Sequence, residues 1–288
     1  MIGAPYKSAG EILAHPRFSQ ARRAHVDALA SVFVRSRIPS RLIVDAASVM
    51  TADLLVGFYA AYDRADPTTL ATAGRLQKLI AEYGLASPRR MDDLIARFRQ
   101  TGYVHAVASV VDRRIRVLKP TERLLAHDRA YIAALYQPLN ILFPDRGYEP
   151  VIRRDPRLHL AIRRIGFFEP PIAPAFIGRH PAIMMFLARD AGYCAFLLLI
   201  KAVLSKKQLV SDDLSFTAIA DRIGVSRTHI RNLFVEAAAE GHVSLTGARG
   251  HVAKVHTRLL DTFDPFLADL ASSLDRIGQI ALARDEEF

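Results

Sequence analysis

The sequence predicts a mainly α-helical fold with two small β-hairpins, built as two similar units joined by a Pro/Arg-rich connector. Apolar residues recur at three- and four-residue steps through most of the 288 residues, which is the periodicity of amphipathic helices. Two β-branched stretches, 104–118 and 243–255, each have a polar middle and each follow a helical pattern. The residues around these stretches are alike in the two halves of the chain, which indicates an internal repeat.

The elements follow in the same order in both halves. In the first half, helices are predicted at 42–62, 70–83, 88–101 and 121–142, with the hairpin at 104–118. In the second half, they are predicted at 183–204, 215–223, 227–240 and from 257 onward, with the hairpin at 243–255. We expect Pro138 to kink the end of its helix and Asp264-Pro265 to kink or break the last one.

The stretch 144–181 is predicted to be a connector with short elements, because it is rich in proline and arginine. Proline fixes φ and has no amide donor, so it interrupts regular structure. We therefore expect three parts: residues 1–143 with the first unit, 144–181 as the connector, and 182–288 with the second unit and a C-terminal helix. The prolines are Pro144, Pro150, Pro156, Pro170, Pro171, Pro174 and Pro181.

Composition favours a polyanionic partner and a soluble cytoplasmic protein. The formal net charge is +10, which suits nucleic acid first and an anionic membrane surface second. Cys194 is the only cysteine, so no disulfide can form within the chain, and its apolar neighbours predict a buried core residue. No signal peptide is recognised at the start. Residues 183–204 carry Arg189, Asp190 and Lys201, which favours a buried helix over a membrane span.

The repeat has a physical reason at each matched position. Gly84 and Gly224 end a helix where a left-handed residue is needed. Ser87 and Ser226 can cap the helix that follows. With the serines aligned, apolar residues coincide at three- and four-residue steps, and Gly102 coincides with Gly241 ahead of the hairpin. The apolar pairs are Met91 with Ile230, Leu94 with Leu233, and Ile95 with Phe234.

The other face of each repeated helix is polar and basic. Such residue types reach phosphates and base edges in a DNA major groove, so this pattern predicts two recognition helices. An αα-corner with a solvated outer face is the alternative. The candidate DNA-binding residues are Ser87, Arg89, Arg90, Asp93 and Arg97 in the first helix, and Ser226, Arg227, Thr228, His229, Arg231 and Asn232 in the second.

At these residues the chain resembles winged helix-turn-helix transcription regulators, and its first half resembles the MarR family. The resemblance covers about residues 70–125. It includes the wing Val-Asp-Arg-Arg-Ile-Arg-Val-Leu at 111–118 and the following turn at 119–125. It implies that Arg113 or Arg114 enters or flanks the minor groove, where a narrow groove concentrates negative potential, with Arg116 beside them.

The second half resembles winged-helix regulators more generally, at residues 214–227. The tip of its hairpin lacks the Asp-Arg-Arg sequence, and Arg249 is the candidate DNA contact there. An ordinary Gly-rich hairpin tip without a DNA contact is an equally good interpretation of this segment. MarR members typically carry one winged helix per chain and dimerise. The tandem arrangement therefore implies either a monomeric pseudo-dimer or a homodimer. We expect the apolar C-terminal segment to pack on the chain's own core rather than to dimerise.

The leading hypothesis is a transcription regulator, and no enzyme motif is recognised. The alternatives are a plasmid-type replication initiator, which also uses two winged helices in one chain, and a non-DNA protein-interaction scaffold. No cofactor, metal site or membrane partner is expected. The MarR resemblance implies that a small aromatic effector could bind in a pocket lined by aromatic side chains. Filling the core is the commoner role of such residues. They are Phe167, Phe168, Phe176 and Tyr193.

Overall fold

The computed structural model is mainly helical, with two separate two-stranded antiparallel sheets, as the sequence predicts. It describes residues 5–35, 42–43, 45–110, 112–168, 178–205, 215–246 and 251–285. Two short 3-10 helices, η1 and η2, accompany the α-helices. The elements are α1 Ala9–Leu13, α2 Phe18–Arg35, α3 Ala46–Ala61, η1 Pro67–Thr69, α4 Ala73–Glu82, α5 Pro88–Gln100, β1 Val104–Ala108, β2 Arg116–Pro120, α6 Glu122–Leu142, η2 Pro144–Arg146, α7 Glu149–Ile152, α8 Pro156–Phe168, α10 Pro181–Leu187, α11 Gly192–Ser205, α12 Phe216–Ile223, α13 Arg227–Ala239, β3 Val243–Thr246, β4 His251–Val255 and α14 Thr257–Asp285.

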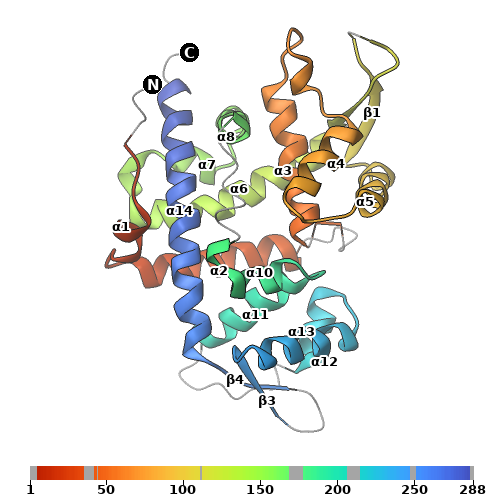
Figure 1. Cartoon of the computed structure of the whole chain (residues 1–288). Helices are drawn as coiled ribbons and strands as arrows, with labels where there is room; N and C mark the ends of the chain where they lie inside the picture. The colour runs from red at the N-terminus through yellow and green to blue at the C-terminus, as the bar shows by residue number, and fades with distance from the viewer. Residues whose placement is uncertain are drawn as a thin grey trace.

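The first repeated unit comprises α3, α4, α5 and the β1–β2 hairpin around a core of its own. The residues buried there come from these elements, from the segments next to them in the chain and from the start of α6. The hairpin is joined to the segment before α4 by one backbone hydrogen bond, in which Leu118 N donates to Ala71 O at 2.8 Å. In Figure 1 this hairpin projects from the end of the molecule that carries α4 and α5.

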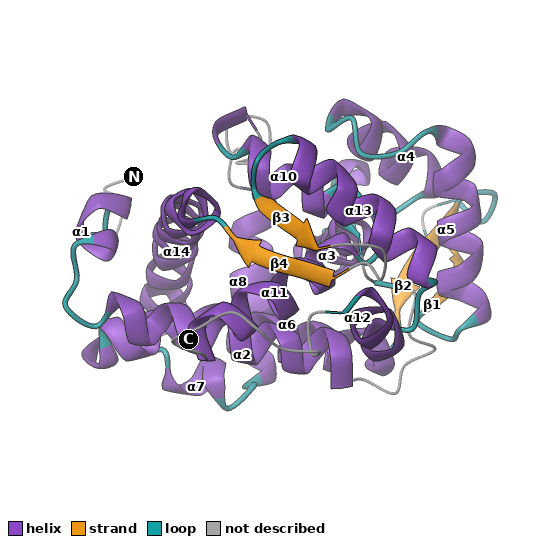
Figure 2. Ribbon diagram, turned by 90° about the horizontal axis from the view of Figure 1, so that it is seen from below, coloured by secondary structure: helices purple, strands orange, loops and turns teal. Residues whose placement is uncertain are grey.

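The second unit repeats that order with α11, α12, α13 and the β3–β4 hairpin. Phe216 of α12 and Phe234 of α13 stack with ring centroids 5.8 Å apart. Seen from below, β3 and β4 lie beside α13, whereas β1 and β2 lie beside α5 (Figure 2). The two hairpins belong to different parts of the molecule rather than to one sheet.

A larger buried cluster unites the second unit with helices from both ends of the chain. Helix α2 packs against α6 and α11, and α1 packs against the long C-terminal helix α14. Helix α14 buries its apolar residues in this cluster, so the expectation that it packs on the chain's own core is confirmed. The residues concerned include Leu259, Phe263, Phe266, Leu274 and Ile277.

The division of the chain at 144–181 stays a prediction, but the buried clusters are not divided there. The larger cluster takes residues from α2, on one side of this stretch, and from α11, on the other. The stretch itself contains α8, which is 13 residues long and packs against both α3 and α14. The prolines of this segment predict only short elements, yet α8 is continuous. Pro156 does not interrupt it, because this proline occupies the first helical position, where no amide donor is needed.

One prediction about helix breaks is wrong. The single helix expected at 183–204 is two helices, α10 and α11, bent by 119°. The chain turns at Ala191, whose φ is +52°, and at Gly192, where a Cβ would lie 2.2 Å from Phe186 O. Pro265 lies inside α14, which continues through it, so this proline does not break the helix; Pro138 lies inside α6. The predicted kinks at these two prolines stay predictions. Burial of the neighbouring Phe263 and Phe266 favours the helix despite the amide donor that Pro265 lacks.

In the described part of the chain, no single helix combines the length and apolar character that crossing a membrane requires. Helices α10 and α11 meet those criteria only as a pair, across their sharp bend. Most of α11 is buried against other helices of the protein, which is the environment of a core helix.

Candidate nucleic-acid interface

Helices α5 and α13 begin in the same way. The Ser87 hydroxyl accepts a hydrogen bond from Arg90 N at 3.3 Å, and the Ser226 hydroxyl accepts one from His229 N at 3.1 Å. Each hydroxyl satisfies one amide that the first helical turn leaves without a backbone partner. The caps predicted from the sequence are confirmed, and each serine is exposed at the start of its helix.

The turns that flank these helices are also alike. The φ angles of Gly84, Gly224, Gly102 and Gly241 lie between +66° and +79°, a region that a side chain disfavours. After each helix the same two backbone hydrogen bonds recur. Tyr103 N donates to Phe98 O and His242 N donates to Ala237 O, both at 2.9 Å; Thr121 N then donates to Tyr103 O, and His256 N to His242 O. The repeat is therefore present in the backbone as well as in the residue types.

The apolar residues that the alignment pairs are all buried under their helices. Because these residues fix which face of α5 and α13 packs inward, they also fix which face remains outward. The buried pairs are Met91 and Ile230, Leu94 and Leu233, and Ile95 and Phe234.

On α5 the outward face carries Arg89, Asp93 and Arg97, all exposed. Arg90 is also exposed, but its guanidinium is held by the carboxylate of Asp45 at 2.7 Å, at the start of α3. Among the described residues Arg89 makes no ion pair, so it is the arginine of the first turn best placed to meet an external anion.

On α13 the outward face carries Arg227, Thr228, Arg231 and Asn232, all exposed. His229 is different: it is half-buried, and its Nε2 lies 2.6 Å from the backbone oxygen of Asp190. That contact fixes the start of α13 against the turn before α11. A structural role therefore accounts for His229 without an external ligand.

The first hairpin carries its arginines at the exposed tip. Strands β1 and β2 pair from Val104 with Pro120 to Ala108 with Arg116, which leaves Arg113 and Arg114 in the turn between them. Both are exposed, as is Arg116, and Arg114 N donates to the Asp112 carboxylate at 2.9 Å. This Asx-type bond gives the Asp-Arg-Arg sequence a structural reason.

The second hairpin is shorter and irregular. Strands β3 and β4 pair with a shift in register between Ser244 and Leu245. Arg249 lies outside the described residues, so its predicted role as a DNA contact stays a prediction.

Two restraints on the basic faces are absent from the sequence prediction. Asp45 caps α3 and holds Arg90, while Arg189 pairs with Glu236 on α13 at 2.6 Å. The cap on α3 has a sequence signal, because Asp45 stands three residues before Ser48 in a reciprocal helix cap. Neither ion pair has one, since the partners are 45 and 47 positions apart.

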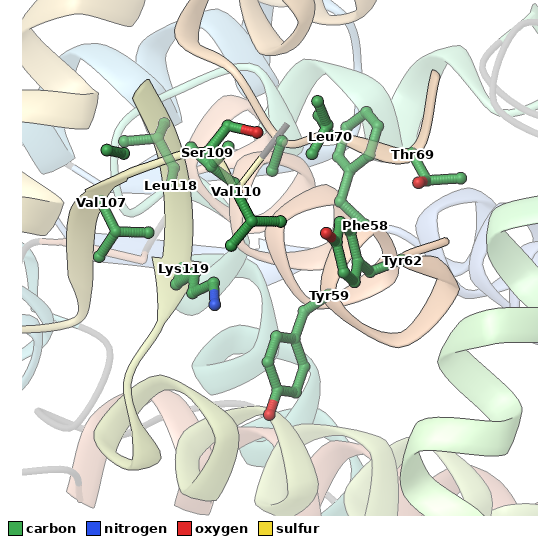
Figure 3. A pocket seen from close by; sticks show the side chains of 13 residues that line it. Phe58, Tyr59, Tyr62, Thr69, Leu70, Val107, Ser109, Val110, Leu118 and Lys119 are labelled. Atoms are coloured by element: carbon green, nitrogen blue, oxygen red, sulfur yellow. The ribbon is translucent and has the colours of Figure 1, made fainter. Parts of the chain in front are cut away.

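Of the aromatics considered for an effector pocket, Phe167 and Phe168 lie together, with ring centroids 5.3 Å apart, whereas Tyr193 lies in the other buried cluster. Tyr193 is buried in the larger cluster, Phe167 packs on Phe58 in the smaller one, and Phe168 is exposed. Phe176 lies outside the described residues. A pocket is found elsewhere, between the end of α3 and the β1–β2 hairpin (Figure 3).

Comparison with known proteins gives no match: no family model, no curated protein and no solved structure is similar to this chain. Among the described residues no group of three or more His, Cys, Asp or Glu side chains is placed to hold a metal ion. The proposals for this chain therefore depend on its own residues.

Proposed function

We propose that this chain is a sequence-specific duplex-DNA-binding transcription regulator that acts in the cytoplasm. In this proposal α5 and α13 are the recognition helices of two winged helix-turn-helix units, and the two hairpins are their wings. The order of helix, helix, helix and hairpin recurs in both units, which is the order that such units require.

The observation that carries the proposal is the repeated, capped helix with an exposed basic face. A single such helix is common on protein surfaces. Here two of them share their cap, their flanking left-handed glycines and their buried positions, while their outer residues differ. A common backbone with different outer residues is what recognition of two DNA sites of different sequence would require.

The residues take different roles in this proposal. Arg89 and Arg231 contribute charge toward phosphates or base edges, and Asn232 offers both a donor and an acceptor to a base. Arg113 and Arg114 reach a minor groove beside the first site. Because the two halves differ, one chain would bind an asymmetric site as a monomeric pseudo-dimer, and a homodimer would bind two such sites.

The test is DNA affinity measured as a function of salt. A duplex is first selected from a random-sequence pool with the full chain, and its affinity is then measured by fluorescence anisotropy. We expect log K to fall linearly with log salt, by about 0.9 for each phosphate neutralised. Arg89→Ala and Arg231→Ala should each weaken binding about tenfold, since each removes one contact of ~1–3 kcal/mol.

The matched control is Arg153→Ala, because Arg153 is an exposed arginine on the loop after α7 whose partner is Glu149. It should leave affinity within twofold. The proposal is wrong if no duplex is enriched from the pool, or if both recognition-helix variants bind like the control.

A plasmid-type replication initiator is the alternative proposal, and the presence of two unequal units in one chain favours it. An initiator would bind repeated sites near an origin, whereas a regulator would bind near promoters. Mapping of the bound DNA across a genome separates the two.

A further inference from the structure

Strand β1 forms an edge of its two-stranded sheet. In an antiparallel pair, residues that exchange hydrogen bonds with the partner strand alternate with residues whose amide and carbonyl groups point away from it. Ser109, directly after β1, donates its amide to Ile115 O at 2.9 Å, so the odd-numbered residues of the strand bond to the β2 side. The amide and carbonyl groups of Ala106 and Ala108 therefore point away from β2.

The outer edge of β1 is uncovered, whereas the outer edge of β2 is covered. On β2, Leu118 N donates to Ala71 O at 2.8 Å, so the segment before α4 occupies that side. Within the described ranges, Ala106 and Ala108 have no hydrogen-bond partner on their outward side. Edge strands are commonly protected by charged residues or by proline, and β1, Val-His-Ala-Val-Ala, contains no Lys, Arg, Asp, Glu or Pro. This edge is therefore open to pairing with a further strand.

An open groove with a volume of about 530 Å³ lies between β1 and the C-terminal half of α5, which are neighbours in Figure 1. Its β1 wall is formed by Val104, His105 and Ala106. Successive side chains of a strand point to opposite faces, so a groove lined by both His105 and Ala106 lies at the edge of the strand. On the α5 wall, Ala96 is small enough to let a main chain approach closely. The groove thus lies beside the open main-chain groups.

The polar side chains of the groove favour an anionic occupant. Arg99 and Gln100 of α5 are exposed, and neither side chain has a hydrogen bond or an ion pair with another described residue. No acidic residue is among those described as its lining. A guanidinium binds a carboxylate through two parallel hydrogen bonds, and the amide of Gln100 offers a donor and an acceptor to a main chain.

We propose that this groove binds an extended acidic segment of a partner protein, which joins the sheet as a third strand beside β1. The main chain of the segment exchanges hydrogen bonds with Ala106 and Ala108, and its carboxylates meet Arg99. A second copy of this chain is a poorer occupant, because pairing of two β1 edges would bring two basic grooves together. None of these residues is assigned to DNA under the proposed function, so the site is additional to it.

Binding is tested on the full chain, without DNA, by fluorescence anisotropy of a labelled peptide, Glu-Thr-Val-Glu-Val-Thr-Glu. We expect saturable binding with a dissociation constant below about 1 mM. The same peptide with Lys in place of Glu should bind at least about fivefold more weakly, because it lacks the carboxylates. The acidic peptide with its three central residues N-methylated should not bind, since it has lost the amide donors that a new strand requires.

Hydrogen exchange followed by NMR locates the peptide on the chain. Without peptide, the amides of Ala106 and Ala108 should exchange rapidly, whereas Val107, which pairs with Val117 on β2, should exchange slowly. Peptide at about ten times its dissociation constant should slow exchange at Ala106 and Ala108 about tenfold. Unchanged exchange at both residues would show that the peptide does not add to this edge.

Two variants identify the contacts. Ala106→Pro removes an outward amide but no hydrogen bond to β2, so the edge strand should tolerate it, and peptide binding should weaken at least about tenfold. Arg99→Gln should weaken binding of the acidic peptide about fivefold, while Lys78→Gln, at an exposed lysine of α4, should not change it. Circular dichroism checks the fold, and Arg99→Gln gives an independent answer if Ala106→Pro does not fold.

The outcomes distinguish the occupants and leave the proposed function untouched, because no duplex is used. Equal binding by wild type, Ala106→Pro and Arg99→Gln overturns the strand-addition site. Protection of Ala106 and Ala108 that rises with protein concentration in the absence of peptide would identify a second copy as the occupant and contradict the proposal. Protection of these amides by a single-stranded oligothymidylate, and not by the peptide, would assign the groove to nucleic acid instead.

Discussion

His25 is a fully buried residue of α2 whose protonation opposes folding. Its Nε2 lies 3.5 Å from the Tyr193 hydroxyl, and its Nδ1 has no hydrogen-bond partner among the described residues. Burial lowers its pKa from 6.5 to about 3. In the unfolded chain His25 is therefore protonated below about pH 6.5, whereas in the folded chain it stays neutral down to about pH 3.

This linkage predicts that acid destabilises the protein through His25. The stability that neutral His25 contributes to the folded state is fully present above pH 6.5 and is lost as the pH falls from 6.5 toward 3. Between pH 7 and pH 5 the free energy of unfolding should drop by about 2 kcal/mol from this residue alone. Urea denaturation at both values should show the drop reduced by that amount in His25→Leu. The control His105→Gln, at an exposed position of β1, should retain the drop of the wild type.

At the residue scale the sequence predicts local backbone conformation well. The serine caps of α5 and α13 and the left-handed glycines beside them depend on a few adjacent residues, and all are confirmed. What adjacent residues do not determine is whether a basic side chain is available. Arg90 and Arg89 look equivalent in the sequence, yet only Arg90 meets the carboxylate of Asp45.

At the scale of elements, α14 crosses α6 at a close approach that depends on Gly278. A Cβ there would lie 2.8 Å from Cε1 and 3.0 Å from the hydroxyl of Tyr136. Tyr136 is fully buried, and its hydroxyl donates to Leu274 O at 2.8 Å, so the ring has little room to withdraw.

Gly278→Ala should therefore destabilise the protein by about 1–3 kcal/mol, which is the usual cost of overpacking a core. The loss is expected although alanine is intrinsically the better helix former by about 1 kcal/mol. Gly74→Ala is the matched control, because Gly74 lies in α4 with no atom within 4 Å of an added Cβ. It should stabilise the protein, and chemical denaturation of both variants measures the difference.

The bend between α10 and α11 shows that the spacing of apolar residues does not predict where one helix ends and the next begins. Apolar residues continue through both helices, so the pattern predicts one helix. The break arises at Ala191 and Gly192, where the backbone folds back toward Phe186 O. Burial of both helices in the larger cluster stabilises that turn, and burial of this kind depends on partners elsewhere in the chain.

At the scale of the whole molecule, a buried ionic cluster joins the first unit to the rest. Arg163 of α8 donates to the carboxylates of Asp128 on α6 and Asp53 on α3, and His159 lies 2.6 Å from Asp128. Burial works to raise the pKa of Asp128, but Arg163 and His159 outweigh it and lower the pKa below its usual value. Burial, opposed by Arg163, raises the pKa of Asp53 to about 6.

Arg163→Met should destabilise the whole protein by about 3–5 kcal/mol, because it leaves the buried carboxylate of Asp128 without its cation. Urea denaturation measures the loss. Arg164→Met, the adjacent and exposed arginine of α8, should change the free energy of unfolding by no more than about 0.5 kcal/mol. Equal effects of the two variants would contradict the stabilising role of the cluster.

The sequence by itself determined most of the helices, the two hairpins, the repeated unit and the capped starts of α5 and α13. These features depend on periodicity and on residues within a few positions of one another, so each is encoded locally. The chain's mainly helical character and its small antiparallel sheets follow from them.

Only the tertiary structure decided how the units are joined, which arginines are restrained and where a pocket lies. Helix α2 packs against α11, Asp53 meets Arg163 across 110 positions, and the pocket forms between α3 and a hairpin that follows it by more than 40 residues. Such contacts depend on which buried faces and charges meet when the chain folds. No local pattern records them, because the partners are brought together only by the packing of the whole molecule.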